Sequence, residues 1–328
     1  MESVYVGGRS YSDPDLVALV RASGGLLDPR SMVINQARKL NRLYREFLSN
    51  DAPFERLKHI ASLSGLEILP MNLDNRAKER RDAVIILNGN GKGRRGQIFY
   101  NPDRPAGRVH FSIAHEIAHT FIPPTTGGTR FREMIDSDSR EANELERLCD
   151  LAASELLMPL EDFRAEVGGC WSIASVPLLL QRFGSSYEAA TFRLASANPG
   201  VAAAGLLKFR LRKEEERALR RQQTASRQQQ LFPTQSSAVL PMPAARYRRQ
   251  SFHVSESFPL SAYVHWNKSF DDDSIVYRTP EGIGLLAASE SLPSANRRLG
   301  ILEAVTAPFQ RPDADPQHPD LLFFWSAA

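Results

Sequence analysis

The chain has 328 residues, of which 42% are hydrophobic and 24% charged, and these values are typical of globular proteins with a buried core. The formal net charge of +3 does not require a nucleic-acid partner, and no apolar stretch approaches the ~18 residues of a membrane helix. The two cysteines form neither a metal-ligand pair nor a disulfide framework, and no signal peptide is apparent, so we expect a reduced, cytoplasmic protein.

The first 30 residues are an N-terminal extension, and the sequence assigns no role to them. Beyond it, apolar residues recur at helical spacing, and short strand-like runs alternate with turn signals. Helices are expected over 31–48 and 54–63, and strands over 67–71, 82–87 and 97–101. Further helices are expected over 109–122, 139–157, 160–167, 176–183 and 187–194. Helices around a small sheet indicate an α+β domain over residues 31–200.

Residues 201–328 have a different pattern, which indicates a β-rich C-terminal domain. Its strands are expected over 205–212, 251–254, 262–266, 274–277, 283–286, 300–307 and 321–325. Residues 213–245 are rich in Glu, Arg and Gln and then in Pro and Ser, without apolar periodicity, so we expect a mobile insertion there.

The segment 208–249 concentrates positive charge, with eleven Lys and Arg against three Glu. Such a segment could bind DNA through phosphate contacts. A solvated linker is the favoured interpretation, because the charges are not interleaved with aromatic residues and no recognition helix is apparent.

A His-Glu-x-x-His motif lies in the helix expected over 109–122. His115 and His119 are one turn apart on the same face, so both imidazoles can reach one metal ion, and Zn²⁺ fits that geometry. Glu116 follows the first ligand and is the candidate general base, acting on a metal-activated water. The alternative is two surface histidines on an ordinary helix. It is disfavoured because the opposite side of the helix is apolar, with Ile113, Ala114, Ile117, Ala118 and Phe121.

A catalytic zinc ion needs a third protein ligand, and the helix expected over 139–157 is the nearest source. At about 100° per residue its apolar residues form one face, and Glu146 lies at the edge of that face. By the same spacing of about 100° per residue, Glu144 is expected to point into solvent. Glu141 lies near the other edge, but in the first turn, where an acidic residue often complements the helix dipole. Glu146 is therefore the best third ligand, and Asp150, one turn later, is placed to orient a histidine.

Two stretches of these helices resemble the ImmA/IrrE family of metallopeptidases. They are Phe-Ser-Ile-Ala-His-Glu-Ile-Ala-His at 111–119, and 146–159, which ends in Ala-Ala-Ser-Glu-Leu-Leu-Met-Pro. The similarity covers about residues 36–195. Leu148 and Cys149 depart from the family's usual Glu-Ala, and Asp150 replaces the commoner Asn. Cys149 is interpreted as a small buried apolar residue.

The resemblance implies a zincin-like metallopeptidase domain, with an active-site helix, a small sheet and a helical bundle, and a gluzincin-like zinc site of His115, His119 and Glu146. It implies a cytoplasmic endopeptidase that cleaves a helix-turn-helix transcriptional repressor and so derepresses stress or mobile-element genes. The C-terminal domain is then expected to sense a signal or to position the substrate. Two histidines and one carboxylate also suit Mn²⁺ or another divalent ion.

A competing hypothesis is a DNA-associated or sensory transcriptional regulator in which the metal site is structural or vestigial. The intact Glu116 argues against it, because a structural site needs no base. Three residues near the active helix, Tyr100, Arg108 and His110, could contact the substrate, although packing or simple exposure explains each of them as well. The strand expected over 97–101 could also accept a substrate segment as an added β-strand.

Overall fold

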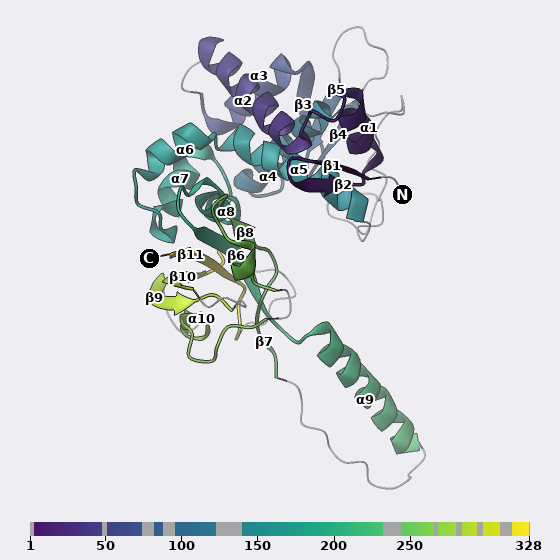
Figure 1. Cartoon of the computed structure of the whole chain (residues 1–328), viewed down its shortest axis with the longest axis vertical. Coiled ribbons are helices and arrows are strands. Elements are labelled where there is room, and N and C mark those ends of the chain that lie inside the picture. Colours follow the sequence, from purple (N-terminus) through teal and green to yellow (C-terminus); the bar gives the residue numbers. More distant parts are fainter. Residues whose placement is uncertain are drawn as a thin grey trace. The chain divides into compact units, whose positions relative to one another are not determined.

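A computed structural model shows that the chain folds into two compact units (Figure 1). The structure describes residues 3–47, 51–73, 82–87, 96–122, 140–231, 244–265, 268–279, 284–293, 298–308 and 317–327. The first unit comprises Met1–Gly169 and Pro177–Ala190, and the second comprises Cys170–Val176 and Thr191–Ala328. None of the described helices combines the length and the apolar composition that crossing a bilayer requires.

The first unit combines helices with a three-stranded sheet of strand order β3-β5-β4, on which α3 and α4 pack. The elements are β1 (Val4–Val6), β2 (Arg9–Tyr11), α1 (Pro14–Ala22), α2 (Pro29–Phe47), α3 (Pro53–Leu63), β3 (Leu66–Pro70), β4 (Ala83–Leu87), β5 (Gly96–Tyr100), α4 (Ala106–Ala118), α5 (Arg140–Leu157), α6 (Leu160–Val167) and α7 (Val176–Phe183). Strand β3 runs parallel to β5, and β4 runs antiparallel to it. The mixed helix and sheet content confirms the expectation that this part of the chain combines helices with a small sheet.

Strand β5 is the centre of this sheet, because it pairs with β3 on one side and β4 on the other along its whole length. The expectation that the strand at 97–101 accepts a substrate segment is therefore wrong. An added strand needs unpaired backbone groups, and within this sheet only the outer sides of β3 and β4 are edges among the described strands.

The N-terminal segment packs on the helices that carry the metal motif. Strands β1 and β2 form an antiparallel hairpin, and Tyr11 and Leu16 share one core cluster with residues of α4 and α5. The Glu144 carboxylate accepts hydrogen bonds from the backbone N–H groups of Ser12 (2.7 Å) and Asp13 (3.2 Å). The expectation that Glu144 points into solvent is therefore wrong, because the segment before α1 lies against that side of α5.

The second unit is built on an antiparallel sheet with the order β7-β6-β11-β10-β9, and β8 also pairs with β6. Its elements are β6 (Ala202–Arg210), α9 (Lys213–Leu231), β7 (Arg246–Arg249), β8 (His253–Val254), α10 (Ile275–Arg278), β9 (Leu286–Ser291), β10 (Leu299–Thr306) and β11 (Leu321–Ala327), and α8 (Tyr187–Ala197) leads into it. Tyr247, Phe323 and Trp325 are almost fully buried in its core. This sheet confirms the β-rich C-terminal domain.

The strand expected over 283–286 lies further along the chain, at Leu286–Ser291, and three other expectations for this domain need correction. Residues 213–231 form the helix α9 and not an irregular insertion, because Glu, Arg, Gln and Ala are good helix formers even without an apolar stripe. The rest of the expected insertion, 232–243, lies outside the described residues. Residues 275–278 form the short helix α10 and not a strand, because Ser274 caps the helix and the Glu290 carboxylate accepts from the Ile275 N–H.

The third correction concerns the strand expected over 262–266. Ala262 and Val264 are buried and Tyr263 is 44% exposed, so the expected alternation of sides is present. The described residues 263–265 nevertheless have no strand partner, and 260–262 form a 3₁₀ turn. Alternation in the sequence reports burial, whereas a strand also requires a neighbouring backbone with which to form hydrogen bonds.

Candidate metal centre

The two histidines of the metal motif lie at the end of α4, against α5. Helix α4 is buried along most of its length, with Val109, Ile113, Ala114, Ile117 and Ala118 in the core. It ends at Ala118, and His119 begins a 3₁₀ turn (His119–Phe121). His115 and His119 are each 8% exposed. Packing of the apolar side of α4 therefore determines where both imidazoles point.

Three potential ligand groups meet between α4 and α5. The Nε2 atoms of His115 and His119 are 3.1 Å apart, and the two rings lie edge to face at 4.8 Å. The Glu146 carboxylate from α5 reaches both, with Oε2 3.1 Å from His115 Nε2 and Oε1 3.8 Å from His119 Nε2. The structure thus brings together the three residues that the sequence predicts as metal ligands.

Helix α5 also contacts the opposite nitrogen of each ring. The Asp150 Oδ1 atom is 2.8 Å from His115 Nδ1, and Cys149 Sγ is 3.4 Å from His119 Nδ1. Because a carboxylate only accepts hydrogen bonds, His115 Nδ1 donates, and its Nε2 is the atom that can bind a metal. Metal-binding imidazoles usually have such a partner on the second nitrogen. Asp150 thus lies where the sequence predicts an orienting group.

The electrostatic surroundings of His115 favour a cation. Burial, the largest influence, lowers the pKa of His115, but hydrogen bonds to Asp150 and Glu146 and the nearby carboxylate charges outweigh it and raise the pKa to about 9. A site that stabilises a positive charge on an imidazole also suits a divalent cation. The residues present therefore fit a metal ion.

Cys149 provides an alternative third donor. One donor atom each from His115, His119 and Cys149 lie within 4.8 Å of one another, a grouping that could hold a metal. The sulfur contacts Nδ1 of His119, however, whereas Glu146 lies on the Nε2 side of both rings. This geometry favours Glu146 as the ligand and Cys149 as a partner that orients His119. Helix phase could have indicated the contact, because Cys149 comes three residues after Glu146, on the same side of α5.

Comparison with known protein families gives a match that includes both α4 and α5. Residues 61–195 match Peptidase_M78, the IrrE N-terminal-like domain. We refer to this matched segment as the IrrE-like domain. The match confirms the resemblance drawn from the helices, and it indicates a metallopeptidase.

Solved structures extend the similarity beyond the IrrE-like domain. A Mycobacterium tuberculosis transcriptional regulator aligns over 91% of this chain and 80% of its own, with a TM-score of 0.50 and 12% sequence identity. At this identity the alignment shows a shared fold alone. A comparison with curated proteins gave no match.

Glu116 is buried in the IrrE-like domain, at 3% exposure, next to His115 in the chain. Its charge contributes to the raised pKa of His115. This is the position that the sequence predicts for a general base, and the assignment of that role stays a prediction.

Two of the three residues that could contact substrate lie in one aromatic cluster. Phe54 stacks on His110 at 5.7 Å and meets Tyr100 edge to face at 5.5 Å. His110 Nδ1 is 2.7 Å from the Gly184 carbonyl, which only accepts, so the imidazole donates at this atom. Burial lowers the pKa of His110, which favours the neutral ring. These contacts explain both residues by packing, and a role in substrate binding stays a prediction.

Arg108, the third of these residues, lies on the exposed side of α4. Its guanidinium forms an ion pair with Asp82, whose other carboxylate oxygen is 3.0 Å from Arg104 Nε. This pair links the start of α4 to the residue before β4. A contact between Arg108 and substrate also stays a prediction.

Proposed function

We propose that this protein is a zinc-dependent endopeptidase. The observation that carries the proposal is the meeting of His115 Nε2, His119 Nε2 and the Glu146 carboxylate, at separations of 3.1 to 3.8 Å, beside a buried Glu116. Two imidazoles and one carboxylate are a common ligand set of catalytic zinc sites. Mn²⁺ or another divalent ion suits the same donors and is the alternative occupant.

The chain's own residues then divide the chemistry among them. His115, His119 and Glu146 would hold the ion, which when bound polarises the scissile carbonyl and lowers the pKa of a water toward ~7. The Glu116 carboxylate accepts a proton from the attacking water and donates it to the nitrogen of the leaving amine. Asp150 Oδ1 holds His115 in the tautomer that presents Nε2.

For the substrate we propose a helix-turn-helix transcriptional repressor, whose cleavage would derepress stress or mobile-element genes. The family match supports this class of substrate. Helix α4 packs against β4 and β5, so a peptide that pairs with the edge of β4 would lie beside the helix that carries the histidines. The second unit would sense the activating signal or position the repressor.

The substitution Glu116→Gln tests the proposal, because it removes the base and leaves the three ligands in place. We expect unchanged metal content by elemental analysis and at least a 100-fold slower cleavage of a helix-turn-helix repressor that the unmodified protein cleaves. The matched control is Glu161→Gln, which removes the same charge at an exposed position of α6 and should cleave normally.

Undiminished cleavage by the Glu116→Gln protein would refute the peptidase mechanism. Undiminished regulation of the target genes by this variant in cells would instead support a regulator with a structural metal site. Loss of metal from the variant would show that Glu116 helps to maintain the metal site. Its role would then not be that of a base alone.

A further inference from the structure

Helix α9 extends away from the sheet of the second unit, and only its first residues adjoin that sheet (Figure 1). Two residues separate it from the end of β6, and it has the sequence KEEERALRRQQTASRQQQL, without an aromatic residue. Of its described side chains, Leu219 is the one large apolar group, and it is partly buried. A helix of this length that lacks an apolar stripe gains little from packing on its own protein.

The first turn of α9 has a definite orientation, because Glu215 is held at the sheet. The Glu215 carboxylate accepts a hydrogen bond from the Arg212 N–H at 2.6 Å and lies 3.7 Å from the guanidinium of Arg248. Arg248 is buried within β7 and donates to the Arg210 carbonyl of β6. The side of α9 that carries Glu215 therefore faces the sheet.

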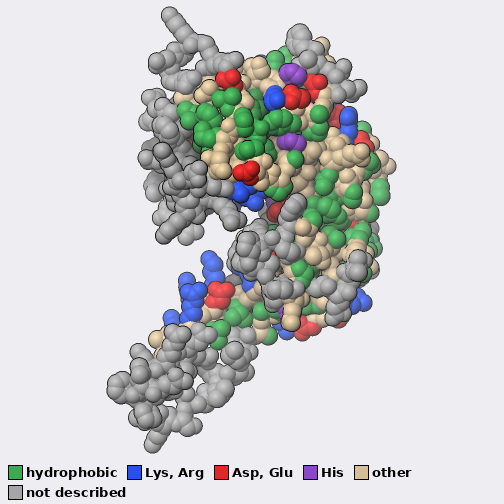
Figure 2. All heavy atoms as spheres, turned by 180° about the vertical axis from the view of Figure 1, so that it is seen from behind, with side chains coloured by type: hydrophobic (Ala, Val, Ile, Leu, Met, Phe, Trp, Pro, Cys, Tyr) green, Lys and Arg blue, Asp and Glu red, His purple; other side chains and the backbone are tan. Residues whose placement is uncertain are grey.

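Three arginines lie on the opposite side of the helix. At about 100° per residue, Arg217, Arg220 and Arg221 fall roughly 140° to 240° around the helix from Glu215, and Thr224 falls at about 180°. All four side chains are exposed. Figure 2 shows Lys and Arg side chains gathered at the N-terminal end of this helix, with acidic groups among them. We call Arg217, Arg220 and Arg221 the arginine face.

The chemistry of the arginine face selects its partner. A membrane-surface helix, or one that docks in a protein groove, needs an apolar side, which the described part of α9 lacks. Single-stranded nucleic acid is usually held by aromatic stacking, and α9 has no aromatic residue. A helix with its side chains is about 10–12 Å across, which fits the ~12 Å major groove of duplex DNA.

We propose that the arginine face of α9 binds duplex DNA through its phosphates, without reading the base sequence. Guanidinium groups bind phosphate oxygens strongly, and such contacts position a protein on DNA without specifying bases. The helix that the structure describes removes one of the two reasons for interpreting the segment as a solvated linker, and the other, the lack of aromatic residues, does not bear on contacts with duplex phosphates. DNA binding by α9 does not depend on the proposed peptidase activity.

Salt dependence measures these contacts directly. We expect the full chain to bind a fluorescent 24-base-pair duplex of arbitrary sequence, with an affinity that falls as salt rises. Each phosphate contact contributes about 0.9 to the slope of log affinity against log salt. The variant R217Q/R220Q/R221Q should therefore have a slope smaller by about 2.7. Between 50 and 200 mM salt, the unmodified chain should then lose roughly 40-fold more affinity than this variant.

Two further variants make the test specific. The control R9Q/K39Q/R42Q removes the same charge from exposed positions of the first unit and should keep the original slope. The conservative variant R217K/R220K/R221K keeps the charge and should also keep most of the slope. Glutamine is a good helix former, so circular dichroism should show equal helix content in all four proteins.

Three results would overturn the proposal. One is an equal loss of slope in R217Q/R220Q/R221Q and in R9Q/K39Q/R42Q, which would assign the binding to net charge alone. Another is tighter binding of a 24-nucleotide single-stranded RNA than of the duplex, with the same dependence on the arginine face. The last is binding to vesicles of anionic lipid that competes with DNA and is lost in the same variant.

Discussion

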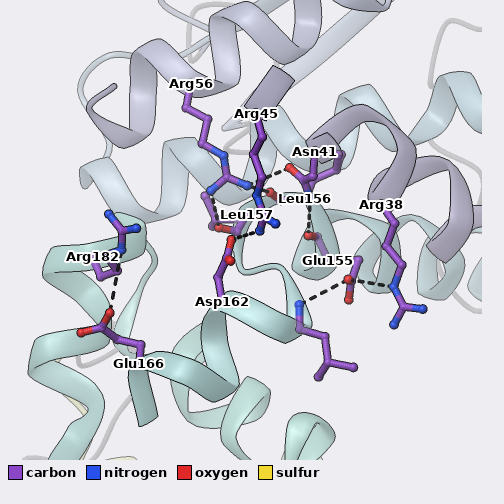
Figure 3. A network of polar contacts seen from close by, with 11 residues as sticks. Arg38, Asn41, Arg45, Arg56, Glu155, Leu156, Leu157, Asp162, Glu166 and Arg182 are labelled. Atoms are coloured by element: carbon purple, nitrogen blue, oxygen red, sulfur yellow. Dashed lines mark hydrogen bonds and ion pairs between the residues drawn. The ribbon is translucent and has the colours of Figure 1, made fainter. Parts of the chain in front are cut away.

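Replacing Arg56 with Met should destabilise the first unit, because this side chain holds the end of the helix that carries the proposed ligand. Arg56 projects from α3, and its guanidinium donates to Asn41 Oδ1 (2.7 Å), the Leu156 carbonyl (2.8 Å) and the Leu157 carbonyl (3.3 Å), as Figure 3 shows. The two carbonyls belong to the last turn of α5, where no intrahelical donor is available. Burial lowers the pKa of Arg56 to about 10, so the group is still charged at neutral pH.

The size of the effect follows from these three bonds. Hydrogen bonds from a charged donor are worth about 1.5–3 kcal/mol each, and water can replace part of that at a partly buried site. We therefore expect Arg56→Met to lower the free energy of unfolding by about 3 kcal/mol. Arg45 lies in the same network and forms an ion pair with Asp162, and the two side chains are 45% and 35% exposed. Arg45→Met should cost less than about 1 kcal/mol.

Hydrogen exchange measured by mass spectrometry along a urea series shows which helix loses stability in each variant. Peptides from α5 should exchange at lower urea in the Arg56 variant than in the Arg45 variant. If the two variants unfold within 0.5 kcal/mol of each other, a threshold of about the usual measurement error, the capping argument fails. A large loss in both would mean that charge, and not the carbonyl contacts, stabilises this region.

Two other expectations concern the metal centre and the N-terminal segment. Asp150→Ala should weaken Zn²⁺ binding about 10- to 100-fold in competition with a chelating dye, because His115 loses the partner of its Nδ1 atom, and an unchanged affinity would contradict the orienting role. Burial and then Asp28 raise the pKa of Tyr11 from 10.0 to about 12 in the folded chain. The stabilisation that the neutral Tyr11 hydroxyl gives the folded chain is therefore complete below pH 10, and it is lost as the pH rises through 12. The difference in melting temperature between the unmodified chain and Tyr11→Phe should shrink across this window, and a constant difference would refute the assignment.

Local periodicity was sufficient to locate most helices of the first unit. The helix expected over 31–48 is Pro29–Phe47, and the one expected over 139–157 is Arg140–Leu157. In both, apolar residues recur every three or four positions, and a helix with that spacing buries one side whatever it packs against. Proline before or after the pattern also marks an end locally.

The same reasoning reached the metal centre, because the relevant spacing is within helices. His115 and His119 share a face by sequence alone, and the phase of α5 separates Glu146 from its neighbours. What the sequence could not supply is the distance between α4 and α5. Only the packed structure brings Glu146 Oε2 to 3.1 Å from His115 Nε2 and places Cys149 against His119.

Contacts between distant segments decided the remaining features. Glu144 has backbone partners in Ser12 and Asp13, more than 130 residues away in the chain, so no local pattern could reveal them. The central position of β5 likewise depends on β3 and β4 pairing with it.

The second unit separates most clearly what the local sequence pattern predicts from what only tertiary contacts decide. The sequence by itself determined that residues 201–328 would form a β-rich domain, since alternation and turn residues are local. The tertiary structure decided that 263–265 lack a strand partner, that Glu290 helps to cap α10, and that Glu215 orients α9. The physical reason is that burial periodicity is a property of each segment, whereas hydrogen-bond partners and ion pairs belong to two segments that only folding brings together.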